Sequence, residues 1–218
     1  MFADMTIEDL TEPPAVIETR LAHAVHRVGT TLLAEAAIHR SVPLDTLASL
    51  RDFLVANLRH HHETEDHDLW PRIVVSAPEV KQALDSLSGE HERLDVALDR
   101  LAAVSIRDDE EDVRAELRDA AAEVRDTVLE HLAHEEPVLF PALRDHISAA
   151  EWTEFARGVI ATTPPVAGHL MVGFLDEVGT PAEVELVLAG LPEPVHALLP
   201  AMRAQAAVDL RVLRGFGS

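Results

Sequence analysis

Apolar residues recur every three or four positions through most of this chain, the period of a helix that buries one face. Residues 16 to about 38 are rich in Ala, Leu and Val and contain no Pro, which predicts a first helix. After a break at Ser41-Val42-Pro43, a second amphipathic helix is predicted. Its apolar stripe consists of Leu44, Leu47, Leu50, Leu54 and Leu58.

Two further helices follow. The sequence SAPE at residues 76–79 has the spacing of a capping box and predicts the start of a third helix, whose stripe includes His91. The charged residues 107–112 indicate a loop or a helix start, and a fourth helix is predicted from about residue 111 to 146, with a kink at Pro137. Four helices joined by short turns, without alternating strand patterns, predict an all-α fold, an up-down four-helix bundle.

The chain divides into three predicted parts. Residues 1–14 are acidic, end in two prolines and form an N-terminal arm; residues 15–147 form the bundle; residues 148–218 form a helical C-terminal extension. In the extension, SAAE at residues 148–151 and TPAE at residues 180–183 are helix-start sequences. Another helix is expected to begin at Thr163-Pro164-Pro165, and a last one to run from about residue 195 to 213.

Composition excludes several classes of function. With 18 Lys and Arg against 39 Asp and Glu, the net charge of −21 should repel nucleic acid and anionic lipid, so neither is an expected partner. No apolar run of membrane-spanning length and no export signal is present, so a cytoplasmic location is expected. The absence of Cys excludes disulfides and thiolate metal sites. The 13 His are the feature of the composition that most indicates a functional site.

One motif occurs twice. Residues 61–71 read HHETEDHDLWP and residues 131–141 read HLAHEEPVLFP, and both fit His-x-x-x-Glu-x-x-x-Leu-(Trp/Phe)-Pro. A His and a Glu four residues apart lie on one helical face, so His61 with Glu65 and His131 with Glu135 can each reach one metal centre. With 13 His and 39 acidic residues in 218, chance predicts about two His–acid pairs at this spacing, and the chain has four. The shared register with Leu-aromatic-Pro is the stronger signal; the alternative is two acidic helix ends with surface His.

A two-metal centre needs ligands from the other two helices as well. His91 lies on the apolar stripe of the third helix, and Asp95 follows one turn later. In the first helix both His23 and His26 can face inward. His26 is favoured because His26 and His91 each have a Leu seven residues on, and His23 is the alternative.

The remaining histidines receive other roles. His62 and His134 lie beside the ligand turns without matching the repeat, and they are expected to hydrogen-bond a ligand, to line the pocket or to transfer a proton during catalysis. His60 and His67 are predicted to face solvent. The chain contains no G-x-S-x-G, P-loop or dinucleotide-binding glycine motif, so those enzyme classes lack support.

With these residues in place, the chain resembles the hemerythrin-like (HHE cation-binding) family over about residues 15–146. The resemblance implies a four-helix bundle around two iron ions with an oxo or hydroxo bridge. Terminal ligands would be His26, His61, His91 and His131, and Glu65 and Glu135 would bridge the irons. Zinc can substitute at such ligands.

The pattern differs from the oxygen-carrying hemerythrins, which have a second His where this chain has Asp95 and a His-x-x-x-x-Asp in the fourth helix. It is closer to bacterial hemerythrin-like proteins, and the extension resembles one found on actinobacterial members.

The functional hypothesis is a non-haem di-iron protein that binds or turns over a small oxidant: dioxygen, hydrogen peroxide or nitric oxide. Enzymatic removal of peroxide or nitric oxide is one form of it. The alternative is a sensor or interaction module, in which iron or oxygen acts through residues 148–218 on a second copy of the chain or on another protein.

Overall fold

The computed structural model describes residues 10–106 and 111–216, so most of the predicted N-terminal arm and the charged residues 107–110 lie outside the described residues. The described residues form helices and no β-strand, which confirms the all-α prediction. The main bundle helices are α1 (Pro14–Ala36), α2 (Leu44–Thr64), α4 (Lys81–Ala103) and α5 (Glu111–His146). The C-terminal helices are α6 (Ala149–Thr162), α7 (Gly168–Val178), α8 (Pro181–Ala189), α9 (Glu193–His196) and α10 (Leu199–Leu213).

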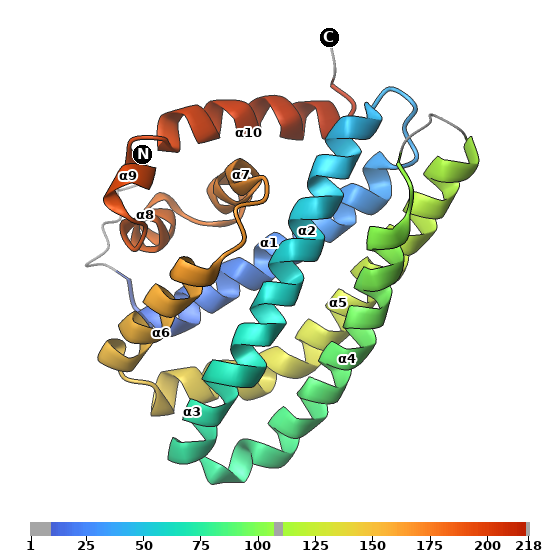
Figure 1. Ribbon diagram of the computed structural model, residues 1–218. Coiled ribbons are helices and arrows are strands. Elements are labelled where there is room, and N and C mark those ends of the chain that lie inside the picture. Colours follow the sequence, from blue (N-terminus) through green and yellow to red (C-terminus); the bar gives the residue numbers. More distant parts are fainter. Residues whose placement is uncertain (1–9, 107–110, 217–218) are drawn as a thin grey trace.

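The four long helices alternate in direction and lie side by side as a bundle (Figure 1). Helix α1 packs against α2 and α5, and α4 packs against the same two helices, so the four enclose one interior. Arg114 of α5 fixes the loop between α1 and α2, because its guanidinium donates to the carbonyl oxygens of His39 and Val42. Helix α5 continues through Pro137 and Pro141 without interruption.

The second bundle helix is longer than α2 alone. A π-helical turn, η2 (Glu65–Leu69), joins α2 to α3 (Trp70–Ser76), and the short 3₁₀ helix η3 (Pro78–Val80) leads into α4. Within the π turn, the N–H of Trp70 donates to the carbonyl of Glu65, five residues earlier. Such turns interrupt α-helices mostly at functional sites, and this one begins at a residue of the repeated motif.

Two apolar clusters fill the interior. One contains the stripe of α2 from Leu47 to Leu58 together with residues of α4 and α5, and the other contains Leu69, Trp70 and Leu139. Between the two clusters lie buried His and Glu residues: Glu65, His131 and Glu135 of the repeated motif, and His91 of α4. A polar layer therefore lies between two apolar ones.

The C-terminal helices pack on one side of the bundle, against α1 and α2 (Figure 1). Leu170, Phe174 and Leu210 belong to the same apolar cluster as the bundle stripe, so extension and bundle share a core. Capping boxes at Ser148–Glu151 and Thr180–Glu183 begin α6 and α8, as the sequence predicts.

Two helix boundaries in the extension differ from the sequence prediction. Helix α7 begins at Gly168 instead of Thr163, because Ala167 adopts a left-handed φ of 44° that interrupts the helical backbone before it. The last predicted helix is divided into α9 and α10.

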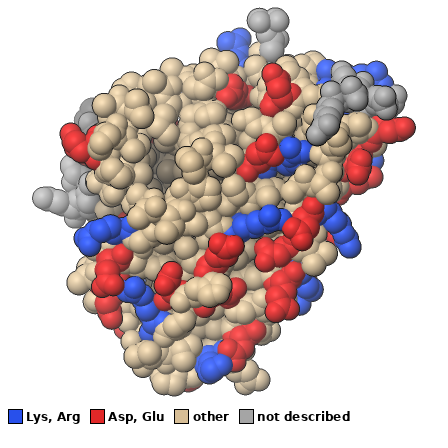
Figure 2. Space-filling view, viewed as in Figure 1, with Lys and Arg blue, Asp and Glu red and all other residues tan. Residues whose placement is uncertain are grey.

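Charged side chains of both signs cover α2 and α4, whereas the face formed by the C-terminal helices shows few (Figure 2). Pairs such as Arg59 with Asp99 and Arg100 with Glu123 join neighbouring helices at this surface. Among the described residues, no helix combines the length and apolar character needed to cross a bilayer.

The close crossing of α7 and α10 predicts opposite effects for two glycine substitutions. A Cβ added at Gly173 would lie 2.6 Å from the Cβ of Ala206, so Gly173→Ala should lower the free energy of unfolding by about 1–3 kcal/mol. A Cβ at Gly158, exposed in α6, would meet nothing within 4 Å. Gly158→Ala should therefore raise the free energy by about 0.5–1 kcal/mol. Urea denaturation measures both, and equal effects would contradict the packing described.

Candidate metal centre

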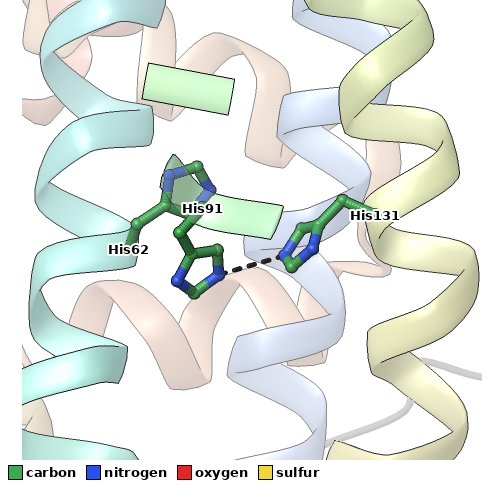
Figure 3. Close-up of side chains that lie close together, drawn as sticks. All are labelled: His62, His91 and His131. Atoms are coloured by element: carbon green, nitrogen blue, oxygen red, sulfur yellow. Dashed lines mark hydrogen bonds between the residues drawn. The ribbon is translucent and has the colours of Figure 1, made fainter. Parts of the chain in front are cut away.

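Two groups of side chains with metal-binding atoms meet in the polar layer of the bundle. One group is His23, His61, Glu65 and Glu135, and the other is His62, His91 and His131. Within each group the ligand-type atoms lie within 4.8 Å of one another. Figure 3 shows the three-histidine group, in which rings from α2, α4 and α5 converge.

The first group places two imidazoles against two carboxylates. The Nε2 atom of His61 lies 3.3 Å from Oε1 of Glu65, and Nε2 of His23 lies 3.6 Å from Oε2 of Glu135. The two carboxylates also face the second group: Oε2 of Glu65 is 3.7 Å from Nε2 of His91, and Oε2 of Glu135 is 3.2 Å from Nε2 of His131. Glu65 and Glu135 therefore lie between the two groups.

The second group consists of three closely packed rings. The Nε2 atoms of His91 and His131 are 3.2 Å apart (Figure 3). The ring of His62 stacks on that of His91, with centroids 4.3 Å apart and planes at 16°. All three residues are buried.

A second carboxylate orients each of three imidazoles. The Nδ1 atoms of His23, His91 and His131 lie 3.1, 3.0 and 3.1 Å from carboxylate oxygens of Glu136, Asp66 and Glu90, respectively. A proton on Nδ1 donates to that carboxylate and leaves Nε2 unprotonated toward the centre. This arrangement fixes tautomer and ring orientation and makes the free nitrogen more basic, as is usual for metal-bound His.

Aromatic residues of the repeated motif pack on two of these imidazoles. Trp70 stacks on His91 with ring centroids 6.1 Å apart, and Phe140 stacks on His23 at 5.8 Å. The preceding leucines of the motif, Leu69 and Leu139, are buried beside them. The shared register therefore has a structural reason: each copy supplies a His, a central Glu and an aromatic ring that covers a His of a neighbouring helix.

The residues fit a pair of bound metal ions. Seven atoms of the two groups are buried without any hydrogen-bond partner: Nε2 of His23 and His61, Nδ1 of His62, and both carboxylate oxygens of Glu65 and Glu135. Each such atom costs roughly 1–3 kcal/mol, so together they cost on the order of 10 kcal/mol. That is comparable with the whole stability of an ordinary domain, about 5–15 kcal/mol. Metal ions between the two groups would remove this cost.

The electrostatics of the centre differ from one imidazole to another. Burial, reinforced by neighbouring histidines, holds the pKa values of His61 and His62 well below their usual range. Burial also disfavours the charged form of His131, but Glu135 and Glu90 outweigh it and raise that pKa. Burial beside Glu135 raises the pKa of Glu65 well above its usual range. Burial alone would raise the pKa of Glu135 too, but nearby His23 and His131 outweigh it and lower that pKa to about 2. One carboxylate is thus held ionised, and a cation is needed to ionise the other.

The structure brings together most of the residues that the sequence singled out. His61, Glu65, His91, His131 and Glu135 all face the centre. In the first helix His23 faces it, and the favoured His26 does not belong to either group. The Nε2 atom of His26 instead lies 2.7 Å from Oδ1 of Asn57 on α2, which turns that imidazole to the side of the bundle.

The positions of three other histidines and of Asp95 can be compared with the roles predicted for them. His62, expected to assist a ligand, lies within the three-histidine group, whereas Asp95 is exposed. The side chain of His134 is 54% exposed and meets the carboxylate of Glu90, which also holds His131. His60, expected to face solvent, is buried, and its Nε2 lies 2.8 Å from the hydroxyl of Thr162.

Sequence reasoning did not identify the orienting carboxylates. Asp66 and Glu136 directly follow the central glutamates in both copies of the motif, and Glu90 directly precedes His91. The signal was therefore present as a His-x-x-x-Glu-acid pattern. At 100° per residue, positions 61, 62, 65 and 66 span a single broad stripe, so His62 and Asp66 could have been placed on the side facing α4.

A cavity adjoins the centre on its α1–α2 side. It has a volume of about 240 Å³ and is lined by His61 and Glu65, by other residues of α1 and α2, and by apolar residues of the C-terminal helices. Glu18 of α1 also lines it, beside Trp152 of α6. Burial raises the pKa of Glu18 to about 7, and the indole of Trp152 opposes that shift only in part.

The family model of the hemerythrin HHE cation binding domain matches residues 17–143, which is more than half of the chain. The matched residues include both groups of candidate ligands and end before the C-terminal helices. Neither the curated proteins nor the solved structures that were compared contain a match to this chain.

The two first-helix histidines should differ in their effect on metal content. His23→Gln removes an atom aimed at the centre and should reduce the metal bound per chain by about half. His26→Gln breaks only the contact with Asn57, so it should keep the full metal content and cost about 1 kcal/mol of stability. Elemental analysis of the purified variants measures the difference. Loss of metal on His26→Gln with retention on His23→Gln would reverse the assignment.

The buried carboxyl of Glu18 predicts a pH-dependent stability. Because its pKa is raised from 4.5 to about 7, the folded chain binds more protons than the unfolded chain between these values. Ionisation of the buried Glu18 carboxyl therefore lowers the free energy of unfolding progressively as the pH rises through that range. Glu18→Gln should be more stable than the parent at pH 8, by on the order of 2–3 kcal/mol, and should lose this advantage toward pH 5. Urea denaturation at both pH values, with exposed Glu35→Gln as the control, tests it; a pH-independent difference would be inconsistent with a buried, titrating Glu18.

Proposed function

The chain belongs to the hemerythrin HHE cation-binding family, and we propose that its bundle holds two iron ions at which a small oxidant is bound or turned over. The oxidant is dioxygen, hydrogen peroxide or nitric oxide. The observation that carries this proposal is the convergence of seven buried, unpartnered nitrogen and oxygen atoms from α1, α2, η2 and α5 on one centre. Protein interiors rarely leave such atoms unpaired, so their concentration at one place supports a metal site.

The two groups suggest how the ligands are divided. His23 and His61 would hold one ion and His62, His91 and His131 the other, with Glu65 and Glu135 shared between them. His62 is thereby assigned as a ligand instead of a proton donor. The orienting carboxylates would keep the imidazole nitrogens directed at the ions.

The donor set is appropriate for iron. Imidazole and carboxylate ligands suit iron, and the chain has no Cys that would favour zinc or copper(I) as thiolate ligands. The same His and Glu atoms can bind zinc, so zinc is expected as a substitute. Two iron ions, when bound, would supply the electrons that reduce an oxidant.

The division of ligands also suggests where an oxidant would bind. Counting the shared glutamates, one ion would receive protein donors from five residues and the other, at His23 and His61, from four. The less saturated side is the side on which His61 and Glu65 line the cavity. A small molecule could reach the centre there without displacing a protein ligand.

His134 fits a positioning role. Its ring contacts the carboxylate of Glu90, and the other oxygen of that carboxylate holds Nδ1 of His131. A hydrogen bond from His134 to Glu90 would draw negative charge away from His131 and so tune the basicity of the facing nitrogen. The side chain of His134 is 54% exposed and belongs to neither group of candidate ligands, so this role acts through Glu90.

A second candidate function is an iron- or oxygen-responsive sensor that acts through the C-terminal helices on a second copy of the chain or another protein. It is favoured by the packing of α6, α7 and α8 against α1, the helix that carries His23. A change in the position of α1 on metal binding would be transmitted to those helices.

The proposal predicts iron content and peroxide reactivity together. The iron-loaded protein should contain about two iron ions per chain, consume hydrogen peroxide and change its ultraviolet–visible absorption on doing so. Glu65→Gln should lose most of the iron and all of this reactivity, because it removes a shared ligand. Glu63→Gln, which alters an exposed residue two positions away, is the matched control and should behave like the parent.

Less than one iron per chain, or equal iron content in Glu65→Gln and the parent, would refute the metal assignment. Full iron content without consumption of peroxide, dioxygen or nitric oxide would refute the oxidant chemistry and favour the sensor.

A further inference from the structure

The cavity beside the centre has two walls of opposite character. Its bundle wall, from α1 and α2, is largely polar and includes Glu18, Asn57 and His60 along with His61 and Glu65. The facing wall comes from α6, α7, α8 and the residues between them, and is almost wholly apolar. Its largest members are Trp152, Phe155, Ile160, Met171, Leu175 and Leu191. An occupant that matches both walls must itself be amphipathic.

Most polar groups of the bundle wall already have partners within the protein. His26 is paired with Asn57, His60 with the hydroxyl of Thr162, and the hydroxyl of Thr64 donates to the carbonyl of His61. Among the lining residues, the unpartnered polar atoms are Nε2 of His61, both carboxylate oxygens of Glu65 and Nδ1 of His26, whose ring contacts that of His61, and on the facing wall Nε1 of Trp152. All but the last lie at the metal-facing end. The polar end of an occupant is therefore directed toward that end of the cavity.

The size of the cavity exceeds what a diatomic oxidant needs. An apolar cavity of about 150 Å³ accepts a benzene molecule. At about 240 Å³, this cavity has room for a benzene ring with a short substituent or a chain of similar bulk. Dioxygen or peroxide alone would leave the apolar wall formed by Trp152 and Phe155 uncovered.

The charge of the cavity selects against an anion. No Lys or Arg occurs among the residues that line it, so a bound carboxylate would find no side-chain cation to pair with. Burying a charge without a partner is costly, so a neutral molecule fits better than an anion of the same shape.

We propose that this cavity binds a neutral, mainly apolar organic molecule with one polar group, and presents that group to the centre at His61 and Glu65. The site depends on the C-terminal helices, which supply its apolar wall. The orientation toward the centre rests on the proposed metal function, whereas binding in the cavity does not. The extension thereby has a role in this chain that the matched family region, residues 17–143, does not include.

The test uses the full-length protein, both iron-loaded and after chelation of its metal, and two probes of nearly the same shape, 4-ethylbenzyl alcohol and 4-ethylbenzoate. Isothermal titration calorimetry should show saturable binding of one alcohol per chain. The benzoate should bind the chelated protein at least about tenfold more weakly than the alcohol, because no bound cation and no lining Lys or Arg can then pair with its buried charge. Iron content is measured on the same samples.

Two matched substitutions locate the binding site. Ala156→Phe places a ring inside the cavity and should weaken alcohol binding at least about tenfold. Ala161→Phe adds the same ring at an exposed position of the same helix, outside the cavity lining, and should change binding less than about twofold. If Ala156→Phe does not fold, crystals of the parent soaked with 4-bromobenzyl alcohol replace it. The anomalous signal of bromine should then lie between α6 and the α1–α2 pair.

The outcomes separate this inference from the proposed function. Binding of the alcohol to a chain that takes up no iron would support the cavity and refute the metal function. Full iron content without saturable alcohol binding would refute the cavity and leave the metal function standing. Equal weakening by both phenylalanine variants, equal binding of the two probes to the chelated protein, or bromine located elsewhere would each overturn the proposal.

Discussion

Two carboxylates in the interior of the bundle, Glu65 and Glu135, impose the main physical constraint on this structure. Both are buried between apolar layers, and none of their four oxygens accepts a hydrogen bond. Buried charges of like sign are strongly unfavourable without a compensating positive charge. Burial holds His61 and His62 neutral, so these two imidazoles supply lone pairs and no charge. Bound cations resolve both problems at once, and the surrounding helices hold the ligands ready for them.

The repeated motif explains how four helices build one centre from few residue types. In each copy the His and Glu face inward, the next acid holds an imidazole of a neighbouring helix, and the aromatic residue covers that same ring. Asp66 and Trp70 act in this way on His91 of α4, and Glu136 and Phe140 act on His23 of α1. The two copies are thus approximately symmetric. The symmetry breaks where His62 in one copy corresponds to Leu132 in the other, which adds a third imidazole on one side only.

The periodic leucines were sufficient to predict the bundle, because an apolar stripe must be buried wherever it occurs. The shared register of the motif was likewise sufficient to predict that motif residues of both copies converge at one centre. What the sequence did not determine is how far each helix is rotated about its axis. His23 and His26 are three residues apart on α1, and the choice between them depends on Glu136 and Asn57, residues of two other helices. The cavity could not be predicted either, since its apolar wall comes from residues about a hundred positions after His61 that carry no recognisable motif.

X-ray diffraction from crystals of the iron-loaded protein, recorded above and below the iron absorption edge, would locate the metal ions relative to Glu65 and Glu135. Two anomalous peaks are expected within the bundle, both next to these carboxylates. One should be ringed by His23 and His61 and the other by His62, His91 and His131. A single peak, peaks outside the polar layer, or no peak with Glu65 and Glu135 still unpartnered would contradict a two-metal centre at this site.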